Sequence, residues 1–301
     1  MTEEKLKLPA YGGQALIEGV LMRGKKALAA AFRSPEGEII VVTEELKGIY
    51  KSNLRNLPFL RGLILLWDAM GLGVQYLTMS ANLQTGEDEK IEGRELIGSL
   101  LFSFAIAIGV FFVLPAFLVE FTETLWGWSP WVSNLLEGFI RLIFIILYIW
   151  GIGKMKEIDR VFAYHGSEHK TINAFEAGLD LTPENVAKCS REHPRCGTSF
   201  ILTVAIFSII IFTLIGPLPM LWRIVTRILL IPVVSGIAYE YTKWVSNHLD
   251  SKFIQTITRP NLALQQLTTR EPDLEVLEVG ITAFNAMLKL ENKLLEAAGE
   301  K

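Results

Sequence analysis

Residues 164–200 read YHGSEHKTINAFEAGLDLTPENVAKCSREHPRCGTSF and form a polar stretch between two strongly apolar runs. The stretch contains three of the four histidines and both cysteines of the chain. His165, Glu168 and His169 form the pattern H-x-x-E-H, and His193 and Cys196 belong to the sequence HPRC. The rest of the chain is therefore interpreted as an arrangement around this polar insert.

The H-x-x-E-H pattern predicts a metal site. If residues 164–177 are helical, His165 and His169 lie one turn apart on the same face, with Glu168 beside them. A second pair of ligands, His193 and Cys196, then comes from a turn. Imidazole and thiolate together are the ligands that zinc prefers, so a divalent metal, zinc, is the expected cofactor.

The composition predicts a membrane protein. Half of the 301 residues are hydrophobic and the mean hydropathy is +0.35, which is too apolar for a typical soluble protein. A helix needs about 17–25 apolar residues to cross a bilayer. The segments that meet this requirement are residues 97–119, 136–153, 199–215 and 220–240.

The distribution of Lys and Arg predicts the orientation of these segments, because cytoplasmic loops are enriched in both. Residues 1–96 and 154–198 are rich in basic side chains, whereas 120–135 contains none. We therefore expect a multi-pass protein of the cell (plasma) membrane with both termini and the insert in the cytoplasm. No signal peptide is expected, and cytoplasmic cysteines are expected to be free thiols or metal ligands.

The expected fold is mainly α: a polytopic membrane protein of about four transmembrane helices with a small α+β cytoplasmic part. That part combines an N-terminal β-hairpin, the central insert and an amphipathic helix over 273–298. Residues 10–24 are predicted to add a glycine-broken strand, with Glu18 as a partner for a cation. The predicted regions are a β-rich region (1–56), an interfacial helix and linker (57–96), two transmembrane helices (97–153), the His/Cys insert (154–198), two more transmembrane helices (199–240) and a C-terminal helical region (241–301).

Charges within apolar segments leave alternatives open. Residues 57–82 are apolar but contain Arg61 and Asp68, so this helix either lies on the cytoplasmic interface or re-enters the membrane. The predicted spans also contain arginines: Arg141 in the second span, and Arg223 and Arg227 in the fourth. These arginines either extend toward the membrane surface or pair inside the bundle with Glu120 or Glu123. Pro232 is expected to kink the fourth span. The helix that continues from this span into the cytoplasm is expected to end at Pro260.

The chemistry of the insert depends on how many ligands bind the metal. Four protein ligands, His165, His169, His193 and Cys196, give a closed structural site, whereas three leave room for water. In the second case Glu168 can act as a general base. H-x-x-E-H is also the motif of zinc proteases in which the usual order of the motif is reversed. The third metal ligand of those proteases is not identifiable in this sequence, and Glu176 is the nearest candidate.

Three classes of function follow. The first is a metal-dependent integral-membrane hydrolase acting on a membrane-associated substrate, and the second is a membrane scaffold with a structural metal. The third is a transporter. The lipid bilayer is the expected partner, and the net charge of −3 gives no support for nucleic-acid binding.

Four separated blocks of the sequence resemble the YqhQ-like family of bacterial integral membrane proteins. The blocks are GGQALIEGVLMRG (12–24), YHGSEHKTINAFEAG (164–178), HPRCGTSF (193–200) and LALQQLTTREPDLEVLEVGI (262–281). The resemblance implies a membrane protein with a metal-dependent enzymatic site, and it names no substrate.

Overall fold

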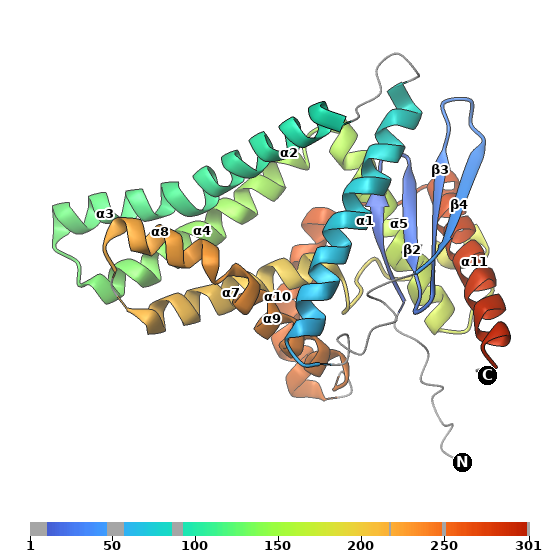
Figure 1. The fold of residues 1–301 in the computed structure, drawn as a ribbon. Coiled ribbons are helices and arrows are strands. Elements are labelled where there is room, and N and C mark those ends of the chain that lie inside the picture. Colours follow the sequence, from blue (N-terminus) through green and yellow to red (C-terminus); the bar gives the residue numbers. More distant parts are fainter. Residues whose placement is uncertain (1–10, 47–56, 86–92, 217, 249–250, 300–301) are drawn as a thin grey trace.

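The computed structural model describes residues 11–46, 57–85, 93–216, 218–248 and 251–299. A β-sheet with packed helices forms one part of the molecule, and a bundle of long helices extends away from it (Figure 1). The candidate site lies where these two parts meet.

The sheet is an antiparallel meander in the order β1-β2-β3-β4. Its strands are β1 (Gly12–Leu16), β2 (Gly19–Arg23), β3 (Ala27–Arg33) and β4 (Ile39–Glu45). The predicted hairpin, β3 and β4, is confirmed, as is its association with 12–22. The prediction of one glycine-broken strand over 10–24 is wrong, because the chain reverses at Glu18, whose φ of 49° lies in the left-handed region.

The helices account for most of the remaining chain. In chain order they are α1 (Leu60–Thr85), α2 (Gly93–Ile108), the π-helical turn η4 (Gly109–Val113), α3 (Leu114–Trp126), α4 (Pro130–Ile152), α5 (Lys156–Glu176), α6 (Pro183–Val186), α7 (Gly197–Ile215), α8 (Met220–Leu229), α9 (Ile231–Ser246), α10 (Lys252–Thr268) and α11 (Leu274–Ala297). Pro260 lies inside α10, so the expectation that it ends a helix is wrong.

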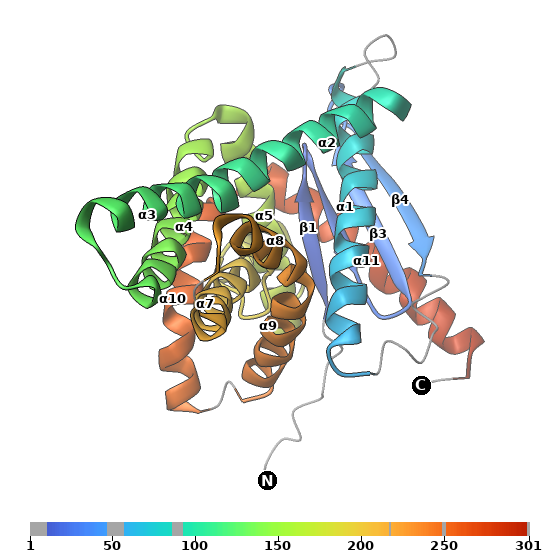
Figure 2. The same cartoon turned by 60° about the vertical axis from the view of Figure 1, so that its left-hand side comes forward.

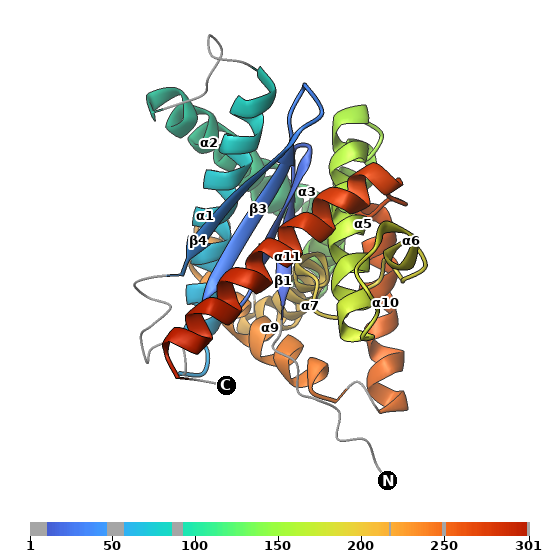
Figure 3. The ribbon, with the colours of Figure 1, turned by 90° about the vertical axis from the view of Figure 1, so that its right-hand side faces the viewer.

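Two apolar clusters cover the two faces of the sheet. On one face, α11 packs its buried Val276, Phe284 and Met287 against β2 and β3, as the amphipathic pattern of 273–298 predicts. On the other face, Tyr76 of α1 packs against Phe32 and its neighbours. Figure 3 shows α11 lying diagonally across the sheet, with α1 behind it.

The bundle contains the predicted transmembrane segments. Among the described residues, three helical stretches are long and apolar enough to cross a membrane: Gly93–Trp126, Pro130–Ile152 and Gly197–Ile215. The bent pair α8 and α9 makes a fourth if it counts as one span. The two helices meet at 45°, and Pro232 lies at the start of α9, so the predicted kink is confirmed.

Helix α1 lies between the sheet and the bundle (Figures 1 and 2). It runs across the direction of α4 and α7, and Arg61 near its start forms an ion pair with Glu240 of α9. The predicted position of this helix on the membrane interface agrees with that direction and stays a prediction. The side chain of Asp68 and residues 86–92 of the predicted linker lie outside the described part of the chain.

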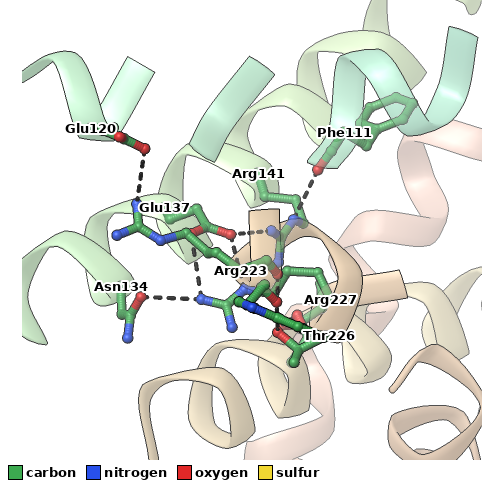
Figure 4. A network of polar contacts seen from close by, with 11 residues as sticks. Phe111, Glu120, Asn134, Glu137, Arg141, Arg223, Thr226 and Arg227 are labelled. Atoms are coloured by element: carbon green, nitrogen blue, oxygen red, sulfur yellow. Dashed lines mark hydrogen bonds and ion pairs between the residues drawn. The ribbon is translucent and has the colours of Figure 1, made fainter. Parts of the chain in front are cut away.

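The bundle buries a network of charged side chains (Figure 4). Arg141 donates to Glu137 over 2.5 Å, and Arg227 donates to the same carboxylate over 3.1 Å. Arg223 lies 3.9 Å from both Glu120 and Glu123. The arginines therefore pair inside the bundle, but the central acid is Glu137, which the sequence analysis did not single out.

Candidate metal centre

Helix α5 carries the two histidines of the H-x-x-E-H pattern on one buried face. Gly166 lets the segment after α10 approach closely, because a Cβ atom there would lie 2.2 Å from the carbonyl oxygen of Arg270. The end of α10 thereby brings the carbonyl oxygen of its last residue, Thr268, to within 2.9 Å of His165 Nδ1. The packing of α5 against this segment therefore fixes the orientation of the His165 ring.

Backbone carbonyls determine the tautomer of both histidines. A carbonyl oxygen only accepts, so Nδ1 of His165 carries the proton that it donates to Thr268, and Nδ1 of His169 donates to the carbonyl of Arg191. In the neutral ring each Nε2 is then a lone-pair donor, which is the arrangement that metal-binding histidines use. Nε2 of His169 is buried and has no hydrogen-bond partner.

Cys196 comes from the loop before α7. Its Sγ lies 3.2 Å from Nε2 of His165 and accepts the amide N–H of Thr198 over 3.3 Å, where it caps the helix. The buried Gln265 of α10 holds the loop, because its side chain bonds both the N–H and the carbonyl oxygen of His193. The sulfur therefore faces the histidines from the positive end of α7.

These three residues fit a zinc ion. Their ligand atoms all lie within 4.8 Å of one another. Bonds of about 2.3 Å to sulfur and 2.0–2.1 Å to nitrogen place tetrahedral ligands roughly 3.3–3.6 Å apart. The distance of 3.2 Å between His165 Nε2 and Cys196 Sγ is close to that range. Nε2 of His169 has no hydrogen-bond partner, and a cation would supply one.

Glu168 lies beside the three ligands. One of its carboxylate oxygens is 4.0 Å from Nε2 of His165. Gly13 of β1 allows the carboxylate to sit under the strand, since a Cβ atom at Gly13 would lie 3.0 Å from Glu168 Cγ. Burial raises the pKa of Glu168, and His165 and the Gly13 amide oppose this only in part.

A cavity of about 490 Å³ opens onto the site. Its wall includes His165, Glu168 and Cys196, together with Gly12 and Gly13 of β1. The volume lies in the range of small-molecule binding sites, about 300–1,000 Å³. A substrate can therefore reach His165, Cys196 and the carboxylate from one side, while His169 lies behind them and is not part of the cavity wall.

His193, the fourth predicted ligand, lies next to this group but faces another partner. Its ring centroid is 5.7 Å from that of His169, and its Nε2 is 3.8 Å from a carboxylate oxygen of Glu176. Burial lowers the pKa of His193, and the hydrogen bond with Glu176 opposes that shift. The geometry thus groups three of the four predicted ligands, and Glu176 pairs with His193 and Arg195 instead.

The remaining candidates have other partners. The cation beside Glu18 is Arg160, whose Nε donates to the carboxylate over 2.9 Å, and Tyr164 donates to it as well. His248 stacks on Trp244 with ring centroids 5.2 Å apart. Cys189 lies near the carbonyl oxygen of Asn185.

The residues of this site lie within a part of the chain that matches a known family. Residues 57–290 match the family model described as "Protein of unknown function (DUF1385)". The chain belongs to this family. It is also 37% identical over 300 residues to "Uncharacterized protein YqhQ" of Bacillus subtilis (strain 168), a match that covers 94% of this chain and 93% of that relative. The resemblance to the YqhQ-like family is thus confirmed, and no solved structure matches the chain.

Proposed function

We propose that the protein is a zinc-dependent hydrolase of the cell membrane that acts on a membrane-associated substrate. His165, His169 and Cys196 would hold the metal, and Glu168 would act as the general base. The observation that carries the proposal is the convergence of three ligand atoms beside one buried carboxylate, at a cavity that His165, Cys196 and this carboxylate line.

The chemistry of the residues supports a reactive site. A zinc ion supplies Lewis-acid activation of a water molecule or of a substrate carbonyl or phosphoryl group. With three protein ligands a coordination position stays open, which is the rule for catalytic zinc sites. Glu168 is suited to accept a proton, since its carboxylate lies beside the ligand atoms and burial raises its pKa.

The position of the site supports a membrane-associated substrate. Cys196 caps α7, a helix of 19 residues that is about 28 Å long and matches the hydrocarbon core. Exposed tryptophans, which favour membrane interfaces, lie toward both ends of the bundle. Trp126, Trp128 and Trp131 lie at the turn between α3 and α4, and Trp150 and Trp244 lie in the last turns of α4 and α9. We place the site at the cytoplasmic interface, because the insert is rich in basic residues.

Cobalt substitution tests whether a coordination position is open. The protein is loaded with Co²⁺, and acetohydroxamate, a small metal ligand, is added while the visible spectrum is recorded. An open site changes its ligand-field bands on addition of acetohydroxamate, and His193→Ala responds in the same way. An unchanged spectrum in the wild type would mean a closed structural metal, as in a scaffold protein.

Incorporation of heavy oxygen tests the reaction class. Membranes that contain the wild type or Glu168→Gln are incubated in heavy-oxygen water, and lipid and peptide products are analysed by mass spectrometry. The wild type is expected to form labelled products, and Glu168→Gln is expected to form none while it retains its zinc. Equal labelling in both would remove Glu168 from the mechanism, and no labelling in either would contradict the hydrolase.

A further inference from the structure

An apolar cavity of about 320 Å³ lies within the bundle. Side chains of α1, α4, α7 and α9 form its wall, among them Leu66, Ile145, Val204 and Val234. We refer to it as the bundle chamber. It is distinct from the cavity over the metal centre, and nothing in the hydrolase chemistry above requires it.

The bundle chamber adjoins the metal-centre cavity at one residue. Ile201 of α7 lines both cavities, and its side chain is 45% exposed although it lies between them. From Cys196 at the start of α7, the helix passes Ile201 and then presents Val204, Ala205 and Ser208 to the chamber. A single elongated ligand can therefore contact both cavities.

Two of the polar side chains on the chamber wall, Arg141 and Ser208, already have partners. Arg141 donates to the carbonyl oxygen of Phe111 and to Glu137, and the Ser208 hydroxyl donates to the carbonyl oxygen of Ala205. The rest of the wall is almost entirely apolar. A polar ligand would lose its hydrogen bonds to water here without replacement, whereas a hydrocarbon would lose none.

The arrangement of the two cavities favours a thin apolar ligand. They meet at Ile201, so a ligand that contacts both extends along α7 from the chamber toward Cys196. An α-helix is about 10 Å wide, whereas an extended hydrocarbon chain is much thinner. A lipid chain therefore suits this arrangement better than a helical protein segment.

We propose that the bundle chamber binds the hydrocarbon chain of a membrane lipid, whose polar end then lies in the metal-centre cavity. The substrate of the hydrolase is accordingly an acyl lipid. This substrate class rests on the proposed function, whereas the binding of a hydrocarbon chain does not.

Photoaffinity labelling tests the binding. The probe is a palmitic acid analogue with a diazirine near its methyl end, added to the zinc-loaded protein in detergent, and the labelled peptides are sequenced. Adducts are expected on chamber residues such as Val204 and Val234, and excess oleate is expected to suppress them. Adducts spread over the exposed outer faces of α2 and α3 would mean ordinary contact with surrounding lipid and would overturn the proposal.

Two phenylalanine substitutions on α7 give a matched comparison. Ala205 lines the chamber and is 6% exposed, whereas its neighbour Ile206 does not line it and is 41% exposed. Ala205→Phe is expected to reduce chamber labelling at least tenfold, and Ile206→Phe is expected to leave it unchanged. The smaller change Val204→Leu, expected to reduce labelling partially, serves if Ala205→Phe does not fold.

Zinc content separates this proposal from the proposed function. If Ala205→Phe loses labelling but keeps its zinc, the chamber binds lipid independently of the metal centre. If the wild type binds no zinc yet its labelling depends on Ala205, the hydrolase fails and the lipid site stands. Equal labelling of wild type and Ala205→Phe, with zinc bound in both, overturns the lipid site alone. Suppression of labelling by an apolar helical peptide rather than by oleate would contradict the choice of a lipid.

Discussion

The molecule contains two buried polar clusters that differ in how their charges and lone pairs are matched. In the bundle, Arg141 and Arg227 converge on Glu137, so opposite charges pair directly. At the metal centre, two imidazole nitrogens and a sulfur lie within 4.8 Å of one another. In the first cluster the chain supplies both charges of each pair, whereas in the second we propose that a bound metal supplies the cation.

This difference teaches what each cluster contributes. A paired charge buried in a bundle stabilises the fold only as long as its partner remains, because an isolated charge in an apolar environment is very unfavourable. A set of neutral lone-pair donors can lose one member without leaving a buried charge behind. Substitutions in the bundle should therefore affect folding first, and substitutions at the metal centre should affect metal binding first.

The largest effect is expected from Glu137→Gln. It keeps the size of the side chain but leaves two buried arginines without their shared counter-ion, so the free energy of unfolding should fall by about 3–5 kcal/mol. Thermal unfolding in detergent measures the change. Glu120→Gln is the control, because Glu120 is 47% exposed in its side chain and lies 3.9 Å from its arginine. Equal stability of the two variants would mean that the bundle network is not a paired unit.

Gln265→Leu tests whether the metal centre depends on its support. The substitution removes the partner of the N–H and carbonyl groups of His193, in the loop that carries Cys196, and of the Ser199 hydroxyl, in the first turn of α7. Unsatisfied buried groups cost about 1–3 kcal/mol each, and loss of such support weakens metal binding about 10–100-fold. A zinc-chelator competition assay measures the affinity. Gln266→Leu, at the exposed neighbouring position, is the control and should change neither the stability nor the zinc affinity. Equal zinc affinity in both variants would contradict the role of Gln265.

Gly13→Ala tests the close approach of β1 to Glu168. The added Cβ atom would lie 2.4 Å from the carbonyl oxygen of Leu21 and 3.0 Å from Glu168 Cγ, so the strand or the carboxylate must move. We expect a loss of about 1–2 kcal/mol in unfolding free energy, as in overpacked interiors. Gly12→Ala is the matched control, because a Cβ atom added at Gly12 would meet nothing within 4 Å. Two variants of equal stability would show that the contact is not tight.

The smallest effect is expected from Glu176→Gln, and it depends on pH. Burial raises the pKa of Glu176, but the hydrogen bond with His193 and the charge of Arg195 outweigh burial and leave the pKa below 4.5. A carboxyl whose pKa is lowered by folding stabilises the folded protein when the pH is above the pKa of the unfolded state. This stabilisation is lost as the pH falls through the lower pKa of the folded state. The half-exposed position limits the effect to below about 1 kcal/mol.

Thermal unfolding of the zinc-free protein at several pH values checks this prediction. The wild type should be more stable than Glu176→Gln near neutral pH, and the difference should shrink as the solution is acidified below pH 4.5. Glu157→Gln, at an exposed position on the same helix, should show no such convergence. A difference between wild type and Glu176→Gln that grows on acidification would reverse the sign and contradict the assignment.

Local patterns predicted much of this structure. Apolar periodicity located the bundle helices and α11, and the Ser34–Gly37 turn sequence predicted the hairpin of β3 and β4. The i, i+4 spacing of His165 and His169 predicted their shared face. These features depend on neighbours in the sequence, so the sequence alone carries them.

Contacts between distant segments account for what the sequence did not predict. Glu137 lies 90 positions from Arg227, and only the folded bundle brings them together. His193 and Cys196 are three residues apart, yet Gln265 holds the loop so that Cys196 faces the ligands while His193 faces Glu176. Pro260 continues a helix where local rules predicted an end, and α10 packs against α7 through Asn261, which donates to Thr203.

Zinc content across a set of single variants tests whether His165, His169 and Cys196 form the metal centre. The purified wild type should contain about one zinc per chain, the stoichiometry of a single site. Most of the zinc should be lost in His165→Ala, His169→Ala and Cys196→Ser, and it should be retained in His193→Ala and Glu168→Gln. Thermal unfolding of each variant checks that the bundle is folded. A wild type without zinc after loading, or a loss in His193→Ala as complete as in His169→Ala, would contradict a centre built from these three ligands.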